Sequence, residues 1–179
     1  MPSGERLVLE LDPAGGPALR VEWDVDALRE RGAAGGQPGT VEAPPAWRLE
    51  PRPDWESASA LRLISATFDD GALLAVAALR PRGAAGHDAD AVGAILVSAE
   101  GEVTRPHEAL LSTEYGPDGT ARRLGLELYQ DPAGPPVRIA ADRIADADAG
   151  DGDAGGRTAL ALRMDGTPGT GLHQLIGAR

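Results

Sequence analysis

The chain has 179 residues, no cysteine and a formal net charge of −11, and all 17 of its basic side chains are arginines. This acidic balance argues against nucleic acid or an anionic membrane surface as a partner, because both require a basic face. Disulfides and thiolate metal sites are excluded. No signal sequence and no apolar run approaching the ~20 residues of a membrane span is present, so we predict a soluble, cytoplasmic protein.

The N-terminal region predicts a β-hairpin. Apolar side chains alternate with polar ones over residues 7–12 and again over residues 19–24, with a Pro/Gly-rich turn between them. Residues 24–31 fit either one short helix or a loop with a single turn. Residues 32–52 are rich in Gly and Pro and show no strand periodicity, so we predict a connector or a lid.

Residues 61–143 predict a series of antiparallel hairpins. Dipeptides such as Asp70-Gly71 and Asp118-Gly119 supply the positive φ angles of tight turns between alternating segments. An acidic loop at 146–156 separates this region from two final strands. The predicted strands cover residues 61–68, 72–80, 91–98, 102–105, 109–115, 121–130, 136–143, 160–164 and 171–176.

These strands predict an all-β fold with one domain over residues 1–179. An antiparallel meander of this length exposes its edges unless it closes, so we expect a lipocalin-like barrel, with a β-sandwich as the alternative. The three tryptophans are half of all the aromatic residues. A Trp that lines a cavity would dominate contact with an apolar ligand, whereas the alternative is that these side chains plug the ends of the barrel.

Specific motifs for catalysis or metal binding are absent. The acidic loop does not follow the EF-hand pattern, because Gly150 and Gly155 fall where ligands are needed and no bidentate Glu follows. We therefore predict neither a metal nor a cofactor. His173 lies on the last predicted strand and becomes a cavity imidazole if its face lines the barrel interior.

Several segments occur in a characteristic order over residues 50–177. They are Arg52-Pro-Asp54-Trp55, Phe68-Asp-Asp-Gly71, Tyr115-Gly-Pro-Asp118-Gly119, Leu124-x-Leu126-x-Leu128 and Gly166-x-x-Gly169-x-Gly171. This order resembles the C-terminal half of the AttH and carotenoid 1,2-hydratase-like lipocalin family. The resemblance implies a barrel with an apolar cavity, in a family that includes hydratases and cyclases acting on polyenes. The chain departs from the family at Asp54-Trp55, where a His-Ser is missing, and at His173-Gln174, where an acidic residue is often found.

We expect the protein to bind a small hydrophobic ligand in a barrel cavity without catalysis. Trp23, Trp55 and Tyr115 are the predicted apolar contacts, and Arg52 and His173 would orient the ligand's polar end. If the protein is instead a hydratase or cyclase, Asp54 and His173 are the candidate acids, since burial can raise a carboxyl pKa toward neutrality. A third possibility is a non-catalytic interaction module that docks through residues 32–52.

Overall fold

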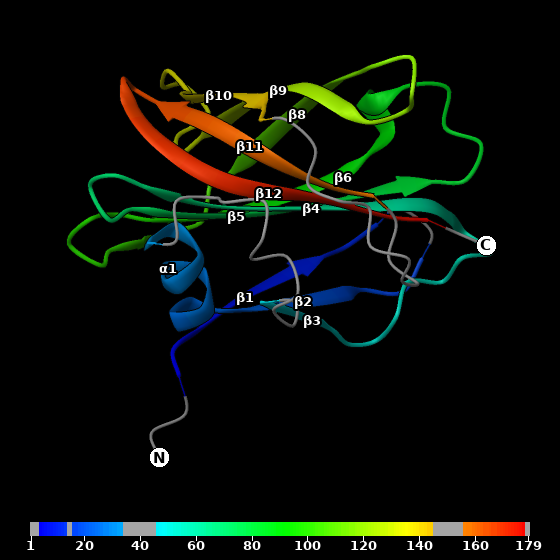
Figure 1. Cartoon of the computed structure of the whole chain (residues 1–179). Helices are drawn as coiled ribbons and strands as arrows, with labels where there is room; N and C mark the ends of the chain where they lie inside the picture. Colours follow the sequence, from blue (N-terminus) through cyan, green and yellow to red (C-terminus); the bar gives the residue numbers. More distant parts are fainter. Residues whose placement is uncertain (1–3, 14–15, 34–45, 145–155, 178–179) are drawn as a thin grey trace.

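The computed structural model describes residues 4–13, 16–33, 46–144 and 156–177. Its strands form two antiparallel sheets (Figure 1). The described part of the chain contains no helix that is both long and apolar enough to cross a membrane.

The small sheet contains the predicted N-terminal hairpin. Strands β1 (Arg6–Leu11) and β2 (Leu19–Asp24) pair in antiparallel register, and β3 (Trp47–Leu49) adds to the other edge of β2. The helical alternative for residues 24–31 is confirmed, since α1 spans Val25–Ala33. Asp24 begins this helix by accepting the backbone N–H of Ala27 at 3.0 Å. Strand β3 lies within the predicted connector, of which residues 34–45 are outside the described part.

The large sheet has nine strands in the order β7-β6-β5-β4-β12-β11-β10-β9-β8. Every strand predicted after residue 60 is present, with ends shifted by a few residues. Their bounds are β4 (Ala58–Phe68), β5 (Leu73–Pro81), β6 (Ala91–Val97), β7 (Val103–Thr104), β8 (Glu108–Tyr115), β9 (Ala121–Tyr129), β10 (Val137–Arg143), β11 (Arg157–Met164) and β12 (Thr167–Gly177). A short 3-10 helix, η2 (His87–Ala89), precedes β6.

The predicted all-β, lipocalin-like class is confirmed, as the large sheet curls strongly into a half-barrel. Its strand order is that of an up-and-down barrel left open at one place. Strands β4 to β7 run outward in one direction, strands β8 to β12 return from the opposite edge, and β12 pairs with β4 at the centre. In an up-and-down barrel the first and last strands also pair, so the order departs from such a barrel only between β7 and β8, which lie at opposite ends of the sheet.

The central strands of the large sheet are buried on both faces. In β5, residues 73–79 are at most 5% exposed, because the small sheet and α1 cover one face and the curled half of the large sheet folds over the other (Figure 1). Leu73 and Ala75 belong to the core beneath the small sheet, whereas Leu74 and Val76 belong to the core inside the curl. The face of the curl that surrounds this second core is called the inner face below.

Curling brings the two ends of the large sheet into contact. Strand β8 lies against β6, although among the described strands these two form no main-chain ladder. Their contact is called the seam below.

Candidate functional site

The inner face of the half-barrel carries one buried histidine among apolar side chains. His173 on β12 is paired in register with Ile64 on β4 and with Thr158 on β11, so all three side chains point into the curl. His173 is 2% exposed, and within the described part of the chain neither ring nitrogen has a hydrogen-bond partner. Buried polar atoms in folded proteins are nearly always paired, so this side chain has capacity for a further donor and acceptor.

The imidazole of His173 is neutral at neutral pH. Burial, together with the positive charge of Arg62, lowers the pKa of His173 to about 4. A neutral imidazole carries one N–H donor and one nitrogen acceptor. The group that it suits best is therefore one that both donates and accepts, such as a hydroxyl.

A buried ion pair lies beside His173 and joins the two ends of the sheet. Arg62 on β4 forms a very short ion pair with Asp90, which precedes β6, and donates to the Thr113 hydroxyl on β8 at 2.6 Å. The side chains of Arg62 and Asp90 are 3% and 1% exposed. Because Thr113 belongs to the strand on the other side of the seam, the Arg62 guanidinium bridges that junction.

Two further side chains extend the seam toward solvent. Arg80 on β5 binds Asp90 at 3.3 Å and contacts His87 Nδ1 at 3.0 Å. The His87 ring in turn stacks on Tyr115 of β8, with 6.3 Å between ring centroids and 19° between planes. The five side chains Arg62, Arg80, His87, Asp90 and Thr113 are called the seam cluster below. Side-chain contacts, and not strand pairing, thus hold β8 against β6.

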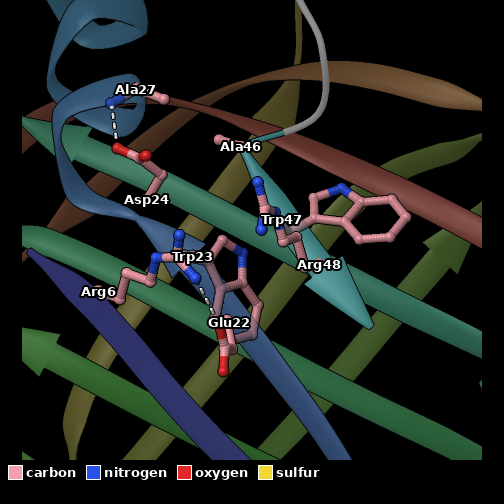
Figure 2. Close-up of a pocket in the computed structure, with 8 residues that line it drawn as sticks. All are labelled: Arg6, Glu22, Trp23, Asp24, Ala27, Ala46, Trp47 and Arg48. Carbon is pink, nitrogen blue, oxygen red and sulfur yellow. Dashed lines mark hydrogen bonds and ion pairs between the residues drawn. The ribbon is translucent and has the colours of Figure 1, made fainter. Parts of the chain in front are cut away.

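A separate pocket of about 240 Å³ lies at the end of the small sheet (Figure 2). It is found where β2 runs into α1 and where β3 begins. Its lining consists of Arg6, Glu22, Trp23, Asp24, Ala27, Ala46, Trp47 and Arg48. This pocket is on the small-sheet side of the large sheet, outside the curl.

The structure divides the residues predicted to bind a ligand among different places. His173 is in the curl and Tyr115 is at the seam, 37% exposed. Trp23 is fully buried between the two sheets, Trp55 packs partly buried against that same core, and Arg52 is exposed on the segment after β3. These five residues therefore do not form one site, and a ligand-binding role for His173 and Tyr115 stays a prediction.

Asp54 lacks the environment that a proton donor needs. It lies exposed in the turn before β4, where it accepts hydrogen bonds from the Ser57 hydroxyl and the Glu56 backbone N–H. These bonds hold the pKa of Asp54 below its ordinary value, opposite to the rise that acid catalysis at neutral pH requires. The three-residue spacing between Asp54 and Ser57 is therefore that of a turn in which the two side chains bond to each other.

Sequence reasoning missed the seam cluster. Arg62 occupies an apolar position of β4, and this lone charge within a hydrophobic run is the signal that could have singled it out. Asp90 and Thr113 carry no comparable signal, because they meet Arg62 only through the curl of the sheet. Among the described residues no group of three or more acidic or histidine side chains could hold a metal ion, and residues 146–155 of the acidic loop lie outside the description.

No family model, no curated protein and no solved structure matches this chain.

Proposed function

We propose that this chain is a binding protein for a small apolar molecule that carries a hydroxyl group, taken up inside the curled sheet. The observation that carries the proposal is His173, an interior imidazole with both ring nitrogens unpartnered in the described part of the chain. The apolar side chains around it would hold the body of the ligand, and the imidazole would bind its hydroxyl. The resemblance to the AttH-like lipocalins points to the same class of ligand.

Several small residues lie on the inner face around His173. Gly171 is two residues away on the same face of β12, and Ala66 is its register partner on β4; Ala78 and Ala94 contribute short side chains from β5 and β6. In the closed sheet neighbouring atoms fill the space beside Gly171, so a guest molecule would fit there only after the sheet opens.

Entry of a ligand would use the seam. The buried side chains of the inner face pack against one another, so uptake requires the sheet to open. Strands β6 and β8 can separate without breaking a main-chain ladder, because the seam is held by the Arg62–Thr113 hydrogen bond and the stacked rings of His87 and Tyr115.

The test is native mass spectrometry of the purified protein, with organic extraction of any bound molecule. Farnesol and the hydrocarbon farnesene are then added as a matched pair with and without a hydroxyl. We expect farnesol to bind about tenfold more tightly than farnesene, the value of roughly one buried hydrogen bond.

Two variants locate the ligand. His173→Leu should abolish the preference for farnesol, while Gln174→Leu should keep it, because Gln174 is equally buried but faces the small sheet. A folded wild-type protein that takes up neither probe and yields no extract would refute the proposed function.

A further inference from the structure

We propose that the pocket at the end of the small sheet binds a small α-amino acid in its zwitterionic form. Its lining contains charged side chains of both signs, and it lies outside the half-barrel interior. Its volume of about 240 Å³ lies below the roughly 300–1,000 Å³ of sites for drug-sized ligands. A ligand of only a few heavy atoms is therefore the size that fits.

The strand register places the charged residues of this lining on one face of the small sheet. Arg6 is the register partner of Asp24, and Glu22 is the register partner of Arg48. Successive side chains of a strand leave opposite faces, so Glu22 and Asp24 are on the same side of β2, opposite to the buried Trp23. All four charged side chains therefore lie on the solvent face, and the indole lies toward the large sheet.

The cation of the pocket that remains available is Arg48. The carboxylate of Glu22, its cross-strand neighbour, is bound instead by Arg6 at 3.0 Å and by Arg20 at 2.8 Å. Arg48 is exposed, and its guanidinium forms no hydrogen bond or ion pair with any described residue. Because a guanidinium binds a carboxylate through two parallel N–H donors, Arg48 is the group that would hold the acid function of the ligand.

Asp24 supplies the opposite charge in the same lining. Its Oδ1 accepts the backbone N–H of Ala27 at 3.0 Å, which turns the carboxylate toward the start of α1. Its Oδ2 accepts no hydrogen bond from the described part of the chain. An ammonium group has three donors and a positive charge, so it is the group that suits this remaining oxygen.

The spacing of these two charges fits a molecule that carries both an ammonium group and a carboxylate. Asp24 is two residues from Glu22, so it is the diagonal neighbour of Arg48 across β2 and β3, at a typical separation of about 7–8 Å. Both side chains line the pocket, yet they form no ion pair with each other (Figure 2). An α-amino acid can pair with both at once, whereas a simple amine or a simple acid can pair with only one.

The experiment is a titration with L-alanine, followed in ¹H–¹⁵N NMR spectra through the backbone amide of Ala27, which donates to Asp24. Propionate is the same molecule without the ammonium group, and ethylamine is the same molecule without the carboxylate. We expect L-alanine to shift the Ala27 signal saturably. Each analogue should bind at least about tenfold more weakly, as for the loss of one hydrogen bond to a charged group.

Two variants separate the two contacts. Asp24→Asn keeps a side-chain oxygen for the helix cap but loses the charge, so it should bind L-alanine about tenfold more weakly and no longer prefer it to propionate. Arg48→Gln should weaken binding by a similar factor and remove the preference over ethylamine. Arg122→Gln removes the same charge from an exposed position on β9 and should leave the affinity unchanged.

Each variant is compared after its NMR spectrum has shown the signal dispersion of the folded wild type. The inference is overturned if L-alanine does not shift the Ala27 signal or if propionate or ethylamine binds as tightly as L-alanine. It is also overturned if Asp24→Asn and Arg48→Gln bind L-alanine as tightly as Arg122→Gln does.

Discussion

At the scale of single residues, His173 couples the stability of the fold to pH. Its folded pKa of about 4 lies below the 6.5 of an exposed histidine, so the unfolded chain takes up a proton first as the pH falls. The contribution of neutral His173 to the free energy of unfolding is therefore fully present above pH 6.5, and it is lost as the pH falls from 6.5 to about 4. The difference in pKa corresponds to about 3 kcal/mol.

We expect His173→Leu to remove this part of the pH dependence. Urea unfolding of the wild type and the variant, measured between pH 7 and pH 4, gives the free energy of unfolding of each. The difference between the two proteins should change by about 3 kcal/mol over that range. Parallel pH profiles would show that His173 titrates normally and is not buried.

The ion pair of Arg62 and Asp90 makes a second residue-scale prediction. Asp90→Ala leaves the Arg62 charge buried without its main partner, and such a loss typically costs about 3–5 kcal/mol. The control is Asp142→Ala, which removes the carboxylate of an exposed pair with Arg123, worth at most about 1 kcal/mol. Equal losses in the free energy of unfolding would place Asp90 in solvent.

The residue scale is also where prediction from sequence succeeded least. The inward position of His173 followed from the alternation of β12, which assigns each side chain to one face once the strand is recognised. The partners of Arg62 did not follow, because Asp90 and Thr113 are 28 and 51 residues away and meet it only across the curl. Likewise, the sequence around Asp54 did not show whether this carboxylate stabilises a turn or acts as an acid. The structure assigns it to the turn before β4.

At the scale of elements, the pattern of apolar residues along a strand differs between strands that are buried on one face and strands that are buried on both. Strand β9 alternates Leu124, Leu126 and Leu128 with less buried residues, as expected for a strand with one face in the core. Strand β5 instead reads as a continuous apolar run, and the structure covers both of its faces. We predicted β5 as a strand, but its place at the centre of the sheet is a finding of the structure.

The pairing of β12 with β4 depends on a close approach at Gly171. A Cβ atom added there would lie 2.5 Å from the Ser65 carbonyl oxygen and 3.0 Å from the Ala66 Cβ. Because main-chain atoms cannot rotate away, Gly171→Ala should push the two strands apart and cost about 1–3 kcal/mol. Thermal unfolding checks this loss against Gly86→Ala, where an added Cβ meets nothing within 4 Å and φ is −156°. A Gly171→Ala protein as stable as that control would mean that β12 and β4 lie further apart.

At the scale of the whole molecule, the sequence predicted the fold class and the meander, but not the pair of distant strands that joins its two ends. Local alternation identifies each strand, and from β4 onward each strand pairs with its neighbour in sequence except β7 with β8. The β4–β12 pair joins segments about 100 residues apart, and no local pattern encodes such a pairing. The separate small sheet was missed for the same reason, since β2 pairs with β3 beyond the predicted connector.

The seam makes a prediction about how the whole half-barrel opens. Thr113→Val preserves the shape of the side chain but removes the acceptor of the Arg62 hydrogen bond across the seam, a loss of about 1 kcal/mol. Strand β8 is an edge strand with a ladder only to β9, so we expect its amides to exchange with deuterium severalfold faster in this variant. Amides of β4 and β12 should keep their rates, because each of these strands is paired on both sides.

Ser112→Ala is the control for this prediction. It alters the neighbouring residue, whose hydroxyl donates to the Gly125 carbonyl on β9, and should leave exchange in β8 closer to that of the wild type. Faster exchange throughout the sheet in Thr113→Val would indicate global unfolding, and the seam would then not be an independently opening part of the fold.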